Sequence, residues 1–274
     1  MVNIVVTGAA SGIGAATLDR LRTSGHDAIG VDLAGTDITA DLASIEGRQD
    51  AVAAVLDSTS GLVHGVVCCA GLGPLSSHSG GKLVAVNYFG AVNFLDGLRP
   101  ALARAGQAYA VAISSSSTST QPGIPEKLVA ACLAGDESAA VALGDTVGAI
   151  PAYPASKLAL AHWVRRSAVT ADWIGAGIRL NAIAPGMIDT PMTSGPDLDP
   201  GLAKALDFYP VPLGRRGRPD EIAALIEFLT GDTASLLCGS VLFADGGTDA
   251  LLRQTDWPSI WEPTPEDLTR HFAG

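Results

Sequence analysis

Two residues that could together move a proton lie one helical turn apart, in the run Tyr153-Pro154-Ala155-Ser156-Lys157. Side chains at positions i and i+4 of a helix share one face, about 6 Å apart at their roots. A free tyrosine loses its proton near pH ~10, and a fixed cation nearby lowers that pKa. The spacing indicates a tuned acid/base pair, but solvated helix faces show it too. How strongly this spacing supports a catalytic pair therefore depends on the rest of the chain.

A glycine-rich turn, Thr7-Gly8-Ala9-Ala10-Ser11-Gly12-Ile13-Gly14, follows the first apolar run. Glycines let the backbone approach a pyrophosphate, and the helix-like stretch that follows offers free N–H groups and the positive end of its dipole. An ordinary tight turn is the alternative. The position of the turn between an apolar strand and a helix, at the start of the chain, favours a dinucleotide site.

Asp32 ends the second apolar run, 18 positions after Gly14. An acid at an offset of about 20 residues typically binds the ribose hydroxyls of NAD. A carboxylate there would repel the 2'-phosphate of NADP, and Leu33 and Ala34 supply no cation to attract it. The sequence therefore predicts NAD as cofactor. The alternative is that Asp32 is only an acid in the turn that ends a strand.

Short β-rich runs alternate with helix-like stretches along the chain. The runs span residues 3–7, 28–32, 62–69, 108–114, 178–184 and 240–244, and the helix-like stretches include 51–56, 83–102, 157–174 and 220–229. Runs that are apolar throughout are typical of a parallel sheet covered on both faces. The alternation predicts an α/β fold, a Rossmann-type doubly wound parallel sheet of about seven strands in a single domain.

Three stretches interrupt this alternation. Residues 122–151 hold two helix-like pieces, 126–134 and 137–147, and residues 248–274 form a tail with Trp257 and Trp261 that we expect to be a docked arm or a subunit contact. Residues 186–219 are rich in Pro and Gly yet contain Met187, Met192, Leu198, Leu202, Phe208 and Tyr209. Apolar side chains on such a loop predict a lid over an apolar substrate, or equally a loop packed on its own core.

Composition excludes several classes of protein. With 274 residues and 47% hydrophobic content the chain can bury one large core. Its 17 basic and 28 acidic residues give a net charge of -11, which argues against nucleic-acid and membrane partners. Four cysteines without metal-ligand spacing and five scattered histidines predict no metal site. Without a signal peptide or a span of about 18 apolar residues, we expect a cytoplasmic protein.

Taken in order, six motifs resemble those of the short-chain dehydrogenase/reductase family. They are Thr7-Gly-x-x-x-Gly-x-Gly14, Ala70-Gly71, Asn87, Ser114-Ser115, Tyr153-x-x-x-Lys157 and Pro185-Gly186. The resemblance spans nearly the whole chain. It implies an NAD-dependent oxidoreductase that interconverts a secondary alcohol and a ketone by hydride transfer.

The resemblance also implies roles for the catalytic residues. Tyr153 would be the general acid or base, and Lys157 would lower the pKa of Tyr153 and bind the nicotinamide ribose. Ser115 would hold the substrate oxygen, and Asn87 would help hold the water chain through which the proton leaves.

The serine assignment stays open, because four consecutive hydroxyl residues follow the strand-like run. Ser114 and Ser116 are the alternatives to Ser115. Strand alternation would place these two on the face opposite Ser115.

By the same resemblance, NAD would be bound by Gly8, Ser11, Gly12, Ile13, Gly14, Asp32, Asp41, Leu42, Cys69, Ala70, Gly71, Tyr153, Lys157, Pro185, Gly186, Ile188 and Thr190. Asp41 and Leu42 would flank the adenine ring, and Ile188 and Thr190 would contact the nicotinamide carboxamide. We interpret Cys69 as a small buried residue rather than a reactive thiol.

The chain departs from the family pattern in the length between serine and tyrosine, where 37 residues separate Ser115 from Tyr153. Far fewer do so in most members. An insertion of this kind, at 122–151, resembles that of the bacterial 3α-hydroxysteroid dehydrogenase/carbonyl reductase subgroup. That resemblance implies a homodimer in place of the common homotetramer, and an apolar substrate such as a 3-hydroxysteroid or another carbonyl compound.

Two other functions compete with this one. A 3-oxoacyl carrier-protein reductase would favour NADPH and a basic docking face, and both Asp32 and the net charge of -11 oppose it. A non-catalytic NAD-binding regulator would not need Tyr153, Lys157, Ser115 and Asn87. The sequence does not name the substrate, its stereochemistry or the physiological direction.

Overall fold

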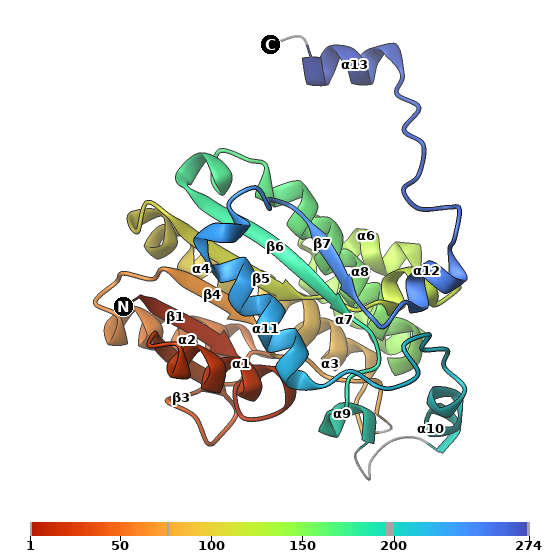
Figure 1. Ribbon diagram of the computed structural model, residues 1–274, viewed down its shortest axis with the longest axis horizontal. Helices are drawn as coiled ribbons and strands as arrows, with labels where there is room; N and C mark the ends of the chain where they lie inside the picture. Colours follow the sequence, from red (N-terminus) through yellow and green to blue (C-terminus); the bar gives the residue numbers. More distant parts are fainter. Residues whose placement is uncertain (1, 76, 195–199, 273–274) are drawn as a thin grey trace.

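The computed structural model describes residues 2–75, 77–194 and 200–272, and within them seven parallel strands form the centre of the molecule (Figure 1). Their order is β3-β2-β1-β4-β5-β6-β7. The strands are β1 Asn3–Thr7, β2 Asp27–Asp32, β3 Ile38–Thr39, β4 Gly65–Cys68, β5 Ala108–Ile113, β6 Ile178–Pro185 and β7 Val241–Ala244. All six predicted strands are present, within a few residues. The two-residue β3 is too short for a recognisable pattern and was not predicted.

The order in which successive strands are added to the sheet reverses at β1, which has β2 on one side and β4 on the other. Val5 pairs with Ile29 of β2 on one side and with Val66 of β4 on the other. In parallel α/β sheets, ligands bind in the crevice that such a reversal opens at the carboxyl ends of the strands. The predicted glycine-rich turn lies directly after β1, at this crevice.

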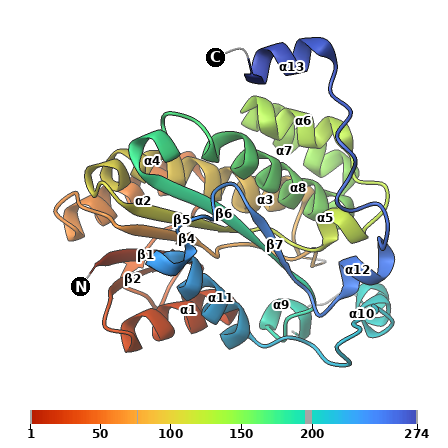
Figure 2. The same cartoon turned by 45° about the horizontal axis from the view of Figure 1, so that its top comes forward.

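Two helical layers cover the sheet (Figures 1 and 2). The helices α1 Gly12–Thr23 and α11 Pro219–Thr230 cover one face, and α2 Ile45–Ser58, α4 Ala91–Arg104 and α8 Ala149–Ala168 cover the other. Successive residues of β1 alternate between the layers, because Ile4 and Val6 are buried with α1 and α11, whereas Val5 is buried with the opposite helices. The doubly wound fold is confirmed.

Three predicted helices have different bounds in the structure. The predicted helix 51–56 is longer at both ends and forms α2, Ile45–Ser58. The predicted helix 83–102 consists of α3 Gly80–Val84, a π-helical segment η1 Ala85–Gly90, and α4. The predicted helix 157–174 begins earlier, at Ala149, and ends at Ala168, before the short η2 Ile174–Ala176. Tyr153 and Lys157 therefore lie in the same helix, α8, one turn apart.

Residues 122–151 form α6 Glu126–Ala134 and α7 Glu137–Val147, after the short α5 Ser117–Thr120. Both predicted helical pieces are observed with the predicted bounds. The two helices pack outside the second layer, α6 against α8 and α7 against α3.

Beyond β6, the lid segment contains α9 Pro191–Ser194 and α10 Pro200–Asp207. Leu198 lies outside the described residues. The chain continues through η3 Asp232–Ala234 to α12 Thr248–Leu252 and α13 Pro265–Phe272, and α13 extends beyond the sheet (Figure 1). Trp257 and Trp261 are more than half exposed. The expected role of this tail, as a docked arm or a subunit contact, stays a prediction.

None of the helices in the described part of the chain combines the length and the apolar character needed to cross a membrane.

Candidate active site

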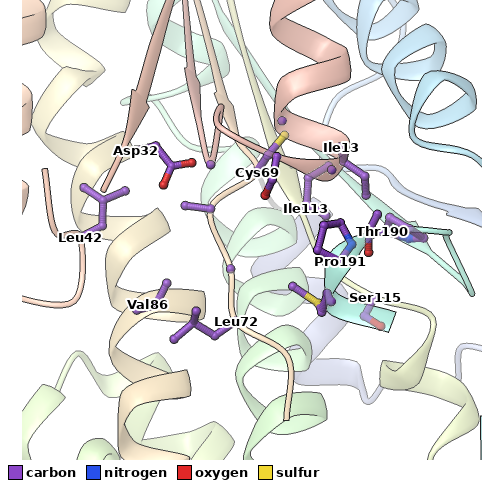
Figure 3. Close-up of a pocket in the computed structure, with 18 of the residues that line it drawn as sticks. Ile13, Asp32, Leu42, Cys69, Leu72, Val86, Ile113, Ser115, Thr190 and Pro191 are labelled. Atoms are coloured by element: carbon purple, nitrogen blue, oxygen red, sulfur yellow. The ribbon is translucent and has the colours of Figure 1, made fainter. Parts of the chain in front are cut away.

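A cavity of about 410 Å³ opens at the carboxyl ends of the central strands. Figure 3 shows Asp32 and Leu42 toward one end of it and Ser115 and Thr190 toward the other. Every residue predicted to bind the cofactor lines this cavity, and so does Ser115. Asn87 does not. The fold thus gathers residues from positions 8 to 190 of the chain into one site.

Glycine is required in the turn after β1. Gly8 has a φ of +68°, and a Cβ there would lie 2.6 Å from the backbone nitrogen of Ala70. A Cβ on Gly14 would lie 2.0 Å from the carbonyl oxygen of Gly8. The N-cap residue Ser11 makes no side-chain cap hydrogen bond, so the first N–H groups of α1 stay available for an anion.

Asp32 is held in place at the end of β2. One carboxylate oxygen accepts a hydrogen bond from the N–H of Ala10 at 2.8 Å, and the other from the N–H of Leu33 at 2.6 Å. A carboxylate fixed at the cavity wall can accept hydrogen bonds from ribose hydroxyls. Together with the free N–H groups of α1, which suit a pyrophosphate, it makes the site fit a dinucleotide.

Lys157 is buried at the centre of the cavity wall. Its Nζ atom donates a hydrogen bond to the carbonyl oxygen of Ile113 at 2.8 Å. Burial lowers the pKa of the ammonium group to about 8, and the thiols of Cys69 and Cys68 oppose that shift. A Cβ on Gly71 would lie 3.3 Å from Nζ, so glycine keeps this side of the ammonium open.

Burial raises the pKa of the Tyr153 phenol above its ordinary value. A hydrogen bond with Ser115 lowers this pKa, and the nearby phenol of Tyr209 raises it further. Lys157 is not among the groups that shift it. The ammonium group of Lys157 instead donates to the carbonyl of Ile113, and its expected effect on the pKa of Tyr153 stays a prediction.

The structure separates the candidate serines. The hydroxyl of Ser114 donates to the backbone oxygen of Lys157 at 2.9 Å, and Ser116 lies outside the cavity wall. Ser115 alone interacts with the phenol of Tyr153. Strand alternation could not decide this, because β5 already ends at Ile113.

Asn87 lies in the π-helical segment η1, and its side chain is fully buried. Its amide oxygen accepts from the N–H of Leu72 at 2.7 Å, and its amide nitrogen donates to the carbonyl of Leu72 at 3.0 Å and to the hydroxyl of Ser156 at 3.4 Å. The side chain therefore fixes the loop after β4 to α8. Its part in a proton relay stays a prediction.

Cys69 lines the cavity beside Lys157. Burial raises the pKa of its thiol to about 12, although Lys157 and a hydrogen bond with Thr17 oppose the shift. The sulfur is a protonated thiol near neutral pH, which fits a small packing residue rather than a nucleophile.

No group of three or more metal-binding side chains occurs among the residues that the structure describes.

Sequence reasoning missed several residues of the cavity wall, among them Leu72, His78, Lys82, Val86 and Thr193. They come from the loop after β4, from α3 and η1, and from the lid segment, which only the tertiary structure brings to the cofactor crevice. An adjacent signal was present for two of them, because Leu72 follows Gly71 and Val86 precedes Asn87 in the sequence. His78 and Lys82 belong to no motif.

Some residues of the predicted lid line the cavity and others do not. Met192 lines the cavity, and its Cγ atom would lie 2.6 Å from a Cβ on Gly73. Phe208 is 78% exposed and does not line the cavity, contrary to expectation. Tyr209 is partly buried, and its hydroxyl is hydrogen-bonded at 2.6 Å to the hydroxyl of Thr120, the last residue of α5.

Comparisons with known proteins agree with this geometry. Residues 4–186 match the model of the NAD dependent epimerase/dehydratase family, and residues 137–249 match a model described as Enoyl-(Acyl carrier protein) reductase. The chain is 41% identical to the 3-alpha-hydroxysteroid dehydrogenase/carbonyl reductase of Comamonas testosteroni, over 93% of this chain and 99% of that protein.

Two solved structures are similar. One is the 3-alpha-hydroxysteroid dehydrogenase from Pseudomonas sp. B-0831 complexed with NADH, at 46% identity and a TM-score of 0.89, covering 93% of this chain and 100% of that one. The other is a short-chain type dehydrogenase/reductase from Mycobacterium ulcerans, at 25% identity and a TM-score of 0.67, covering 92% and 94%.

Proposed function

Because this chain belongs to the short-chain dehydrogenase/reductase family, we propose that it uses NAD to interconvert an apolar secondary alcohol and the corresponding ketone. It is an oxidoreductase. One observation carries the proposal: the phenol of Tyr153 and the hydroxyl of Ser115 lie together on the wall of a cavity whose other end holds a fixed Asp32 carboxylate.

When bound, NAD supplies the acceptor or donor of hydride. The N–H groups at the start of α1 would hold its pyrophosphate, and the Asp32 carboxylate its adenosine ribose. Lys157 would hydrogen-bond the ribose nearer the reacting end, from its place beside Gly71. Asp32 disfavours NADP because two negative groups would meet there.

The chain's own part in the reaction is to position the substrate and to move a proton. Ser115 donates a hydrogen bond to the substrate oxygen and thereby holds it beside Tyr153. The phenol gives its proton to that oxygen when a ketone is reduced and takes one from it when an alcohol is oxidised. A phenol whose pKa burial raises suits the first task, since it keeps its proton until a negative oxygen forms beside it.

The substrate class is supported by the apolar residues near Ser115 and by the relatives. Pro191 and Met192 of the lid segment line the cavity. The proteins from Comamonas testosteroni and Pseudomonas sp. B-0831 are named as 3-alpha-hydroxysteroid dehydrogenases. We therefore propose a 3-hydroxysteroid or a similarly apolar carbonyl compound as the substrate.

Replacing Tyr153 by Phe tests the assigned acid/base. With NAD and a panel of hydroxysteroids and simpler cyclic alcohols, the wild type forms NADH, and Tyr153→Phe lowers kcat by about 100-fold or more because the proton donor is lost. NADH fluorescence titration should give an unchanged Kd. Activity retained by Tyr153→Phe would refute the role of Tyr153, and no turnover of any alcohol by the wild type would refute the substrate class.

A 3-oxoacyl reductase is the second candidate, and the match of residues 137–249 to a carrier-protein reductase model favours it. The same assay discriminates between the two. A 3-oxoacyl thioester reduced faster than every cyclic ketone would replace the steroid proposal with this one.

We also propose that the chain forms a homodimer and resides in the cytoplasm. The exposed tryptophans of the C-terminal arm support an association between copies. All four cysteines are free, which fits a reducing compartment.

A further inference from the structure

A second hollow, which we call the side groove, adjoins the main cavity and shares His78 with it. Its volume is about 300 Å³, and its walls are Pro74, Leu75 and His78 on one side and residues 147–151 on the other. Residues 147–151 run from the last residue of α7 through Gly148 into the first turn of α8, and they end two residues before Tyr153. The side groove therefore adjoins the main cavity at His78 and borders the helix that carries the proposed acid/base.

The side groove is apolar except for His78. Its walls carry proline, leucine, valine and isoleucine side chains, and Ile150 is 48% exposed to solvent. Covering such surface with an apolar ligand is favourable, because it removes apolar area from water. A rigid ring system held by its polar end at Ser115 could gain this energy by extending into the groove.

His78 presents a defined polar atom to this apolar surface. Its Nδ1 atom lies 3.1 Å from the carbonyl oxygen of Gly73. A carbonyl oxygen only accepts hydrogen bonds, so the neutral ring carries its proton on Nδ1, and Nε2 is left as an acceptor. Within the described residues no group hydrogen-bonds to Nε2.

The ring is also held in position. The N–H of His78 donates to the carbonyl of Leu75 at 3.0 Å, and the N–H of Leu75 donates to the carbonyl of Gly73 at 2.8 Å. Backbone and ring thus fasten His78 to the same short turn. An acceptor placed this way can discriminate ligands, because leaving it without a donor in an apolar site costs binding free energy.

We propose that the side groove holds the apolar end of the substrate and that Nε2 of His78 accepts a hydrogen bond from a hydroxyl group on that end. The inference rests on the proposed function and narrows it. The substrate would be an apolar ring alcohol or ketone that carries a second hydroxyl, remote from the reacting carbon. His78 is then a specificity residue that does not touch the reacting atoms.

Two substitutions of His78 distinguish the roles of its two ring nitrogens. His78→Asn retains an amide N–H near the position of Nδ1, where it can bond to Gly73, but has no atom at the position of Nε2. His78→Gln places an amide near the position of Nε2. The substrates are a fused-ring ketone and its analogue with one hydroxyl added on the ring farthest from the ketone, each reduced with NADH.

The wild type should prefer the hydroxylated ketone by about tenfold in kcat/KM, the effect of one good hydrogen bond. His78→Asn should lose this preference, mainly through KM, and His78→Gln should keep part of it. The ketone without the added hydroxyl should lose less kcat/KM than the hydroxylated ketone in both variants. Calorimetric binding of both ketones to the NAD-loaded protein, in which the cofactor has no hydride to donate, gives the same comparison without turnover, so a failure of the proposed reaction is distinguished from a failure of this inference.

Ile150→Glu tests the groove itself, at a position exposed enough to leave folding intact. It should lower kcat/KM for both ring ketones about fivefold or more, since a carboxylate would occupy apolar surface. A short acyclic ketone should be unaffected.

Three results would overturn the inference. One is an equal preference of wild type and His78→Asn for the hydroxylated ketone. Another is a stronger preference for a carboxylated analogue that Lys82→Met abolishes, since Lys82 also lines the main cavity. The third is that Ile150→Glu changes the oligomeric state but not the specificity, which would make the groove a subunit contact.

Discussion

At the scale of single residues, the site depends on burial more than on the proximity of opposite charges. The ammonium of Lys157 donates to the backbone carbonyl of Ile113, and burial lowers its pKa to about 8. Burial accordingly moves the two pKa values in opposite directions, up for Tyr153 and down for Lys157. Both shifts have the sign expected of desolvation, because burial disfavours the phenolate of Tyr153 and the ammonium of Lys157.

A buried lysine of lowered pKa has a measurable effect on stability. Between the folded pKa of about 8 and the ordinary value of 10.5, the unfolded state binds more protons than the folded state, so the free energy of unfolding rises with pH. Relative to Lys157→Met, the wild type should gain at most about 3 kcal/mol across that window. Urea unfolding of both proteins at pH 7, 8.5 and 10 measures the difference.

The comparison with Lys157→Met is needed because Cys68 and Cys69 titrate with the opposite sign. Burial raises the pKa of each thiol, so above pH ~9 the unfolded state loses protons that the folded state keeps, and stability falls. Both proteins contain these cysteines. A difference that stays constant from pH 7 to 10 would contradict the lowered pKa of Lys157.

At the scale of elements, one ion pair fastens the additional helix α7 to the Rossmann core. Nη2 of Arg48, in α2, lies 2.9 and 2.8 Å from the two carboxylate oxygens of Glu137, in the first turn of α7. Arg48 is only 3% exposed, and its Nη1 atom is buried without a hydrogen-bond partner among the described residues. Glu137 is therefore the group that compensates the buried guanidinium.

Glu137→Gln should lower the free energy of unfolding by about 2–4 kcal/mol, because it leaves a buried charge without its counter-ion. Glu126→Gln, in the exposed first turn of α6, is the matched control and should change stability by less than about 0.5 kcal/mol. Chemical denaturation measures both. The double variant Arg48→Met/Glu137→Gln should recover part of the loss, and equal effects of the two single Gln variants would show that the pair contributes nothing.

At the scale of the whole molecule, the C-terminal arm carries apolar surface that its own body does not cover. Trp257, Ile260 and Trp261 are 54%, 87% and 61% exposed, on a segment that extends beyond the sheet (Figure 1). Aromatic side chains of this kind are concentrated at the centres of subunit interfaces. The proposed homodimer would bury them against a second copy.

Sedimentation velocity should therefore give a species of roughly 56 kDa, twice the chain mass of 27.8 kDa. The double variant Trp257→Ala/Trp261→Ala should weaken dimerisation about tenfold or more, since buried aromatic residues commonly dominate interface energies. Leu236→Ala serves as the control, because Leu236 is 96% exposed outside the arm. A monomeric wild type would refute the dimer, a tetramer would replace it, and a dimer indifferent to the tryptophans would assign the interface elsewhere.

The fold and most of the cofactor crevice follow from the sequence pattern. Apolar runs define parallel strands, Gly8 follows the end of one strand and Asp32 ends another, whereas the helix that carries Tyr153 begins before its predicted start. Parallel strands bring their carboxyl ends to one edge, so residues far apart in the sequence can be assigned to one site from their positions after successive strands. The NAD-dependent oxidoreductase class followed from the same motifs.

The tertiary structure was needed to see where charges and hydroxyls point. It alone distinguished Ser115 from Ser114, directed the ammonium of Lys157 to Ile113, and brought His78 to the junction of two hollows. These outcomes depend on burial and on hydrogen bonds between segments distant in sequence. A local pattern fixes which residues share a strand or a helix face, whereas desolvation and partner geometry exist only once the elements have packed.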